Sequence, residues 1–448
     1  MPAAARLASA MNTLPSADNF SARFSDQERR RNRLYAYAST WFGCFSEVML
    51  DSSAIIILFI TMLRGSATLA MLSTSLTALT AIFLNIPGAV IADRIGLRRA
   101  YTIACYLGCG GFLAMAAAPA LAAPLDRYLV LAGCLVYCVS RSLYGVTWYP
   151  LLDNILMPAE RSRFFGKMRY TYLSLTAAGF FLLSLALGEE PPLWAMQVVI
   201  AAAGLMLIGR KLCLDRLPVD ARERGALDWK KSLGISIRNL PLTGWAVYIC
   251  CLGLASSSML PLALIYLKRE VQAPADVVQW ISVAYMAGLI FGYLLSARLL
   301  RRYGVRLIQP LGHLFYIAVG CALFLIGPGV PGFFFITGAI LFLLGFWVAN
   351  CLCCYSMELL ALARPGNKIM AAAYLSTYNA IGAAASRFAT SMIIGAGILA
   401  PHWIKWGMRF SSYQTLFLLF GALQIFFLLM LVLVPSIVPQ HDDYYAPA

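Results

Sequence analysis

Twelve apolar stretches, each about as long as a bilayer requires, follow one another along this chain of 448 residues. A helix that crosses a bilayer needs about 20 consecutive, mostly apolar residues, and only helices and closed barrels satisfy their backbone hydrogen bonds in lipid. The stretches are centred near residues 48, 80, 108, 140, 177, 202, 255, 287, 316, 345, 383 and 423. The sequence therefore predicts an all-α membrane protein with twelve transmembrane helices.

The composition favours the same class. Hydrophobic residues make up 61% of the chain and charged residues only 12%, whereas a soluble domain carries about 25% charged residues. Because twelve spans and short loops use up the length, no separate soluble domain is expected. A membrane sensor, or a membrane protein that recruits partners, would need such a domain, so this class is disfavoured.

The net charge of +15 would indicate nucleic-acid binding in a soluble protein. If both termini are cytoplasmic, however, most of the 35 Lys and Arg residues fall in cytoplasmic segments, which is the bias that orients membrane proteins. We therefore expect a lipid bilayer, and no nucleic acid, as the partner. The arginine-rich start lacks a cleavable signal pattern, and the absence of organelle signals favours a bacterial inner (plasma) membrane.

The predicted organisation is two six-helix bundles with a charged segment between them. The expected parts are a cytoplasmic tail at 1–33, a bundle at 34–210, a cytoplasmic loop at 211–241, a second bundle at 242–435 and a second cytoplasmic tail at 436–448. A shift of 204 positions places Trp41 on Trp245 and Gly88 on Gly292. Parallel repeats of this kind are one known plan of transporters, so we expect the two bundles to be pseudo-symmetric.

A short charged block joins the second and third predicted spans. It contains two glycines, one acid and three arginines: Gly88, Gly96, Asp93, Arg94, Arg98 and Arg99. The carboxylate lies where it can face the positive N-terminal end of a helix, and the glycines allow a tight turn and a close helix approach. We interpret the block as a gate; the alternative is that its arginines only anchor the chain at the cytoplasmic surface.

Across nearly its whole length the chain resembles the major facilitator superfamily. The charged block resembles the family motif G-x-x-x-D-R-x-G-R-R, except that four residues rather than three separate Gly88 from Asp93 and that Leu97 occupies a usually basic position. In the fourth span, Arg141-Ser-Leu-Tyr-Gly145 fits the motif R-x-x-x-G. The resemblance implies two six-helix bundles that rock about a central site, and it implies that Asp93 meets helix 11 across the seam between them.

Charged residues inside a membrane are costly and usually functional. Four of them lie within the predicted spans: Glu47, Asp51, Arg141 and Arg387. Glu47 and Asp51 are four residues apart and therefore share one helix face. With a rise of about 1.5 Å per residue, Glu47 lies roughly level with Arg141, and Asp51 with Arg387, so we expect these two pairs.

A carboxylate beside a cation stays ionised, and it takes up a proton when the cation leaves. We therefore predict that Glu47, Asp51 and Arg141 couple transport to protons. Proton–sugar symporters of the superfamily, which have an acid in helix 1 beside an arginine in helix 4, are similar. The alternatives are a static ion pair at Glu47 and, for Arg387, direct binding of an anionic substrate.

Aromatic and amide side chains in spans four, seven, ten and eleven are candidate substrate contacts. Aromatic faces with scattered polar groups suit sugars, nucleosides or amphipathic drugs. Together with Arg387, the candidates are Tyr137, Trp148, Tyr248, Trp347, Asn350, Tyr378 and Asn379. The alternative is that many of them belong to interfacial aromatic belts or to helix packing.

The sequence carries no recognisable catalytic or metal motif. The 12 cysteines read as small apolar residues, and the three histidines are placed in loops or at span edges. We predict a monomeric transporter without metal or cofactor, not an enzyme. Its predicted function is proton-coupled symport of a small, polar, sugar-like solute. The alternatives are a proton-coupled efflux antiporter of drugs or metabolites and a proton-independent facilitator.

Overall fold

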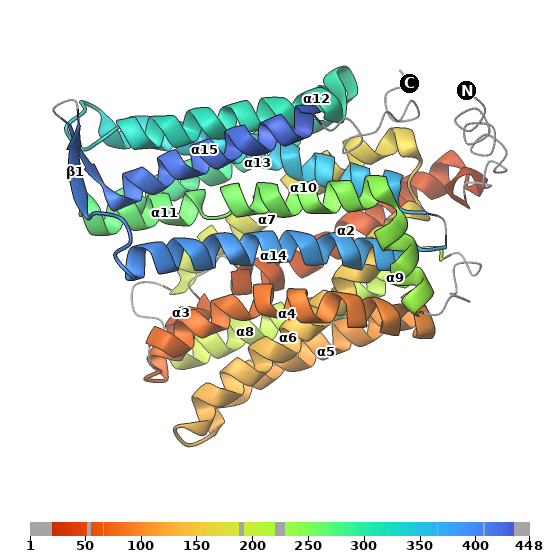
Figure 1. The fold of residues 1–448 in the computed structure, drawn as a ribbon. Helices are drawn as coiled ribbons and strands as arrows, with labels where there is room; N and C mark the ends of the chain where they lie inside the picture. Colours follow the sequence, from red (N-terminus) through yellow and green to blue (C-terminus); the bar gives the residue numbers. More distant parts are fainter. Residues whose placement is uncertain are drawn as a thin grey trace, which may run out of the picture.

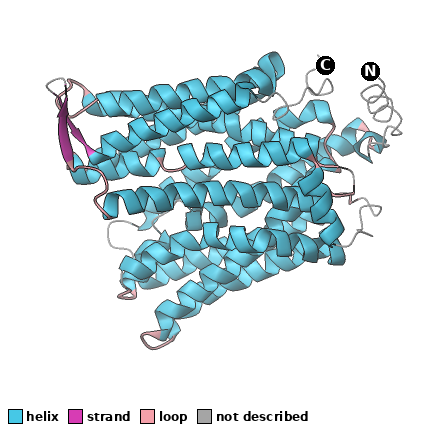
Figure 2. Ribbon diagram, viewed as in Figure 1, coloured by secondary structure: helices cyan, strands magenta, loops and turns pink. Residues whose placement is uncertain are grey.

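The computed structural model describes residues 20–51, 55–65, 67–187, 192–219, 229–364, 366–405 and 408–433. The described elements are helices, apart from one short hairpin (Figures 1 and 2). The hairpin pairs β1 (His402–Lys405) antiparallel with β2 (Met408–Ser411) at one end of the helix bundle. The short helix α9 (Trp229–Arg238) lies at the opposite end. We call these the hairpin end and the α9 end.

The N-terminal half consists of helices that precede α9. Its bounds are η1 (Phe20–Arg23), α2 (Asp26–Asp51), α3 (Ile55–Met62), α4 (Ala67–Ile95), α5 (Leu97–Ala117), η2 (Ala118–Ala120), α6 (Leu125–Asp153), η3 (Pro158–Glu160), α7 (Arg161–Leu187) and α8 (Leu193–Leu214). α2 and α3 together make the first span. The side chain of Asp51, the last residue of α2, lies outside the described residues.

The C-terminal half follows α9. Its bounds are α10 (Leu240–Ser256), α11 (Met259–Ile265), the π-helical turn η5 (Tyr266–Glu270), α12 (Ala275–Leu325), α13 (Phe333–Leu362), α14 (Lys368–Gly395) and α15 (Ser412–Leu433). α10 and α11 form the seventh span with a break between them.

α12 contains two spans. Gly304 has φ 68° and ψ 168°, a conformation that suits glycine, and the chain turns back there. A Cβ on Gly288 would meet the backbone of Phe342 in α13, whereas a Cβ on Gly312 would meet Cys351 nearer the other end of α13. The two arms of α12 therefore run in opposite directions along the same neighbour.

The helices are long and apolar enough to form the predicted spans. Among the described residues, eight helical segments meet both conditions, and α12 counts twice. The long helices α2, α7 and α14, of 26, 27 and 28 residues, supply the remaining three spans. The predicted all-α fold of twelve transmembrane helices in two six-helix bundles is confirmed.

The two halves meet along helices that are far apart in sequence. α14 packs against α4 and α6, and α12 packs against α7. The repeat is visible in this packing, because Gly88 of α4 faces α6 while Gly292 of α12 faces α13, the equivalent helix of the other half. The bounds 34–210 and 242–435 stay a prediction; α8 runs on to Leu214, and α9 lies inside the predicted 211–241 loop.

One histidine was wrongly placed from sequence. His313 is only 1% exposed and lies within the second arm of α12, where its Nε2 is 2.7 Å from the hydroxyl of Tyr248 in α10. Because long apolar segments flank this histidine, hydropathy alone does not show whether it lies inside a span or at the edge of one. It packs inside the C-terminal half.

Candidate functional site

A cavity of about 250 Å³ lies between the two halves. Its walls come from α2, α6, α7 and α8 of the N-terminal half and from α12 and α13 of the C-terminal half. The lining residues are Thr40, Cys44, Glu47, Tyr144, Trp148, Tyr149, Met168, Arg169, Tyr172, Arg210, Tyr293 and Leu352. Aromatic rings and three charged groups therefore make up much of the described lining, with few aliphatic side chains.

An ion pair between α2 and α8 forms one wall of the cavity. Arg210 Nη2 lies 2.5 Å from Glu47 Oε1, and the Arg210 Nε–H donates to the carbonyl of Ser39 at 3.2 Å. The side chains of Arg210 and Glu47 are 6% and 32% exposed. The predicted pair of Glu47 with Arg141 is therefore wrong, because the cation at Glu47 is Arg210. Arg141 itself is half-buried in α6 and is not among the lining residues.

Gly43 makes room for this pair. Ser39, Gly43 and Glu47 follow at four-residue spacing on one face of α2, and the guanidinium of Arg210 crosses that face at the glycine. A Cβ on Gly43 would lie 1.4 Å from Arg210 Nη2. The guanidinium is also stacked 4.3 Å from the ring centre of Tyr144. The small residue on the acid-bearing face was the sequence feature that could have indicated a large side chain opposite it.

Arg210 was missed because it stands where the apolar run of its span ends. The sequence after it is charged, so it reads as the first loop residue. The helix continues to Leu214, however, and Arg210 is 5% exposed. Depth estimates along a helix also ignore the long reach of an arginine, which places its charge well away from its own backbone.

A second arginine of the cavity was also missed. Arg169 of α7 is 9% exposed. Its Nη2–H donates to Ser356 Oγ of α13 at 2.7 Å, and its guanidinium carbon lies 5.4 Å from the ring centre of Tyr293 in α12. Among the described residues, no carboxylate lies within ion-pair distance of it. Arg169 thus reaches across the seam to neutral groups of the other half.

The predicted substrate contacts are placed in different surroundings. Trp148 lines the cavity. Tyr137 is 2% exposed and packs edge-on against Phe112 in the core of the N-terminal half, and Tyr248 is fully buried beside His313. Neither lines the cavity, since both side chains are used for helix packing.

The remaining predicted contacts belong to α13 and α14. Trp347 stacks on a ring of α12, and the Asn350 side-chain amide donates to a backbone carbonyl of its own helix at 2.9 Å. Tyr378 is half-buried, whereas Asn379 and Arg387 are exposed on α14. None of these five lines the cavity described above.

The charged block lies at the α9 end. Asp93 and Arg94 of α4 line a small cavity of about 70 Å³ together with Asn367 and Ile369 at the start of α14, the eleventh span. Asp93 therefore faces the N-terminal end of α14, in the place that the family resemblance implied. A gating role for the block stays a prediction.

Two other residues of the block shape its turn. Gly96, with φ 86°, begins α5 in a conformation that side chains disfavour. Arg98 donates to the carbonyl of Asp215 at 2.7 Å, just beyond α8. Arg99 is exposed, and Gly88 packs near the backbone of Leu143 in α6. The block thus connects three helices of its own half as well as facing α14.

Polar contacts join the halves at the α9 end. Asp153 at the end of α6 pairs both with Arg161 of its own half and with Lys368 of α14. Deeper in, the hydroxyls of Tyr149 and Ser356 are 3.3 Å apart. These contacts join the two halves between the end of α6 and the cavity, which Tyr149 lines.

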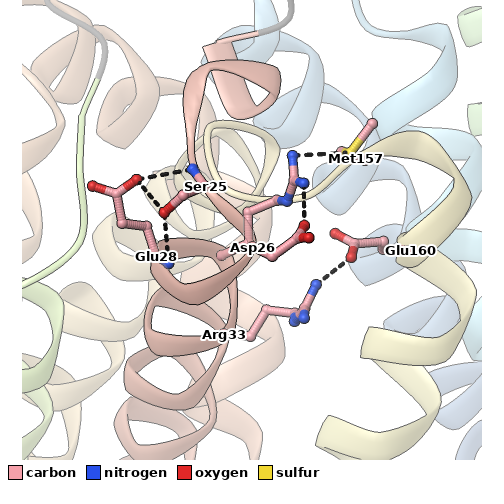
Figure 3. Close-up of polar contacts among 7 residues, drawn as sticks. Ser25, Asp26, Glu28, Arg33, Met157 and Glu160 are labelled. Carbon is pink, nitrogen blue, oxygen red and sulfur yellow. Dashed lines mark hydrogen bonds and ion pairs between the residues drawn. The ribbon is translucent and has the colours of Figure 1, made fainter.

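The start of α2 adds contacts within the N-terminal half (Figure 3). Ser25 and Glu28 cap each other's backbone N–H groups, at 2.9 and 3.3 Å, which is the reciprocal arrangement of a capping box. Arg33 pairs with Glu160 of η3. The first turns of α2 are therefore attached to the loop that follows α6.

No group of three or more His, Cys, Asp or Glu side chains that could hold a metal ion occurs among the residues that the structure describes. The described cysteines are free and mostly buried in helices. Among the described lining residues, the charged and hydroxyl-bearing side chains include two arginines, one carboxylate and several tyrosines.

Solved structures with the same fold are membrane transporters. The proton:xylose symporter XylE, bound to 6-bromo-6-deoxy-D-glucose, has a TM-score of 0.72 at 12% identity over 94% of this chain and 98% of XylE. A variant of the E. coli fucose:proton symporter FucP has a TM-score of 0.65 at 11% identity over 91% of this chain and 98% of FucP. A bacterial homologue of the iron transporter ferroportin, in an outward-facing state, has a TM-score of 0.65 at 13% identity over 90% and 98% of the two chains. A search of curated protein sequences gives no match.

At these identities the structures show a shared fold only. The family profile is the stronger finding, since the profile of the Major Facilitator Superfamily matches residues 40–387, more than three quarters of the chain. The profile spans both halves, the charged block and the whole lining of the cavity. This chain belongs to the Major Facilitator Superfamily and is a multi-pass membrane transporter rather than an enzyme.

Proposed function

We propose that this transporter is a proton-coupled symporter of a small, polar organic solute, with Glu47 as the proton carrier and Arg210 as its movable cation. The observation that carries the proposal is the Glu47–Arg210 ion pair in a cavity that both halves line. Beside the guanidinium the carboxylate stays ionised, and it takes up a proton when the guanidinium is drawn away. A solute or a helix movement that competes for Arg210 therefore changes the protonation of Glu47.

Movement of the halves supplies the rest of the cycle. In the state described here the Asp153–Lys368 contact and the Tyr149–Ser356 contact join the halves at the α9 end. To open this end, both contacts must break, and Asp93 must move away from the start of α14. Asp51 and Arg141 stay predicted members of the proton pathway. The positive-inside bias supports a cytoplasmic α9 end, with both termini on that side of a bacterial inner membrane.

Two fold neighbours support coupling to protons. Their descriptions name a proton:xylose symporter and a fucose:proton symporter. The tyrosine and tryptophan side chains around the cavity suit a hydroxylated or ring-shaped solute, because they offer both ring faces and hydroxyl groups. Proton-coupled efflux and proton-independent facilitated diffusion are the competing functions for the same cavity.

Proton flux in proteoliposomes tests this proposal. Pools of candidate solutes are added outside vesicles that contain either wild-type protein or Glu47→Gln, with Arg33→Gln as a control for an ion pair remote from the cavity. We expect protons to enter with a solute in the wild type and in the control, and not in Glu47→Gln. Protons leaving as a solute enters would indicate exchange, and solute entry without proton movement would indicate a facilitator; either result contradicts symport.

A further inference from the structure

The charges of the described residues that line the central cavity do not balance. Among these residues, Glu47 contributes one negative charge and Arg210 and Arg169 contribute two positive charges, and the others are uncharged. Arg210 is neutralised by Glu47 at 2.5 Å. The excess positive charge therefore belongs to Arg169.

Arg169 has donors to spare. A guanidinium carries five N–H donors, and the described acceptors at Arg169 are the hydroxyl of Ser356, 2.7 Å away, and the hydroxyl of Tyr293. No nitrogen of Arg169 is among the buried polar atoms without a partner, so the nitrogens that lack a protein acceptor keep exposed surface. Because Arg169 lines the cavity, the remaining donors are open to whatever occupies it.

A buried arginine without an anion is costly, and such residues in membranes mark sites of function. The described partners of Arg169 are the hydroxyl of Ser356 and the hydroxyl and ring of Tyr293, which are weak substitutes for a carboxylate. A planar guanidinium binds a carboxylate with two parallel hydrogen bonds. The cavity, at about 250 Å³, is smaller than most ligand pockets, so its occupant is a small molecule.

We propose that Arg169 is an anion subsite, and that the transported solute is a small carboxylic acid whose carboxylate binds this guanidinium. That the acid is transported rests on the proposed function. That it binds to Arg169 does not. The aromatic residues around the cavity then contact the ring or hydroxyl groups of the acid. Since Ser356 belongs to the other half, a carboxylate that takes over Arg169 also competes with a contact that joins the halves.

The test compares acids with their uncharged counterparts as ligands of the purified full-length protein. Benzoate with benzamide, and gluconate with glucose, are titrated in detergent while thermal unfolding is followed. We expect the acids to raise the unfolding temperature and the neutral partners not to. The effect should vanish in Arg169→Gln, persist in the surface control Arg33→Gln, and weaken about tenfold in Arg169→Lys, which keeps the charge but not the planar fork. If Arg169→Gln does not fold, the Lys variant carries the test.

Three results would overturn the proposal: an equal response to acids and neutral partners, no response to any acid, or an acid response that survives in both Arg169 variants. Loss of the response in Arg387→Gln instead would assign the anion to α14. Because this assay needs no proton gradient, its failure leaves the coupling role of Glu47 untouched. Conversely, proton coupling that fails in vesicles leaves the binding result standing.

Discussion

Two arginines of the N-terminal half enter the same cavity from α7 and α8, which both pack against α2, and their surroundings differ. Arg210 is neutralised inside its own half by Glu47, at 2.5 Å. The contacts described for Arg169 are with neutral groups of the other half. A charge that is balanced within one half stays balanced when the halves rock. A charge whose partners belong to the other half loses them when the halves separate. Arg169 is therefore the charge that a bound solute is suited to neutralise.

The largest difference is expected between removing the acid that pairs with Arg210 and removing Arg169 itself. Glu47→Leu leaves Arg210 buried and unpaired, and this should lower the stability by about 3–5 kcal/mol. Arg169→Met removes a charge that has no carboxylate partner among the described residues, so stability should be unchanged or raised. Thermal unfolding in detergent measures both. A strongly destabilised Arg169→Met would show that the two sites do not differ in the way described.

Gly43 tests how tightly the Arg210 site is built. In Gly43→Ala the new methyl group would stand 1.4 Å from Arg210 Nη2, so the guanidinium must move and the pair with Glu47 weakens. We expect a loss of about 1–3 kcal/mol, typical of overpacking. Gly110→Ala is the matched control, because nothing lies within 4 Å of its Cβ position; it should gain about 0.5–1 kcal/mol. Equal responses of the two variants would contradict the tight fit.

The contrast between contacts within a half and contacts across the seam can be tested at the α9 end. Lys368→Gln removes an ion pair that joins the halves, whereas Arg33→Gln removes one inside the N-terminal half. We expect Lys368→Gln to favour opening by roughly 1 kcal/mol, a small value because the lysine is partly exposed. Hydrogen–deuterium exchange at the start of α14 should rise in this variant and not in Arg33→Gln. Equal exchange in both would show that Asp153–Lys368 does not hold the halves together.

The smallest effect concerns an acid outside the membrane. Hydrogen bonds from the backbone N–H and the hydroxyl of Ser25 lower the pKa of the Glu28 carboxyl from its usual 4.5. The folded protein therefore binds this proton less readily, so the cap stabilises α2 above pH 4.5 and is lost as the pH falls through the lowered value. Amide exchange at the first turn of α2 should increase on acidification, and in Ser25→Ala it should already be fast at neutral pH. A pH-independent first turn would contradict the capping role.

The fold followed from the sequence because each apolar run is long enough to determine a helix by itself. The offset of 204 residues also predicted a structural match, since Gly88 faces α6 and Gly292 faces α13, the equivalent helix of the other half. The family motif located Asp93 opposite α14. These features depend on local sequence or on a repeated pattern, so one sequence is enough to find them.

The site was harder to predict because it depends on which helix faces pack against one another. Glu47 was found as a charge inside a span, but its partner Arg210 looked like a loop residue. Arg169 was overlooked because hydropathy places it near the start of the fifth span, where basic residues are common. Tyr137 and Tyr248 were assigned to substrate from their residue type, although helix rotation buries them in the cores of the two halves. Rotation about a helix axis is set by packing, which the sequence pattern did not resolve.

The central claim is that Glu47 takes up a proton when Arg210 leaves it. Infrared difference spectroscopy of the purified protein at neutral pH measures this directly, through the carbonyl stretching band of a protonated carboxylic acid. We predict that Arg210→Met shows this band, that the wild type lacks it, and that the double variant Arg210→Met/Glu47→Gln loses it again. If Arg210→Met shows no band, or if the band survives in the double variant, Glu47 is not the proton carrier that Arg210 controls.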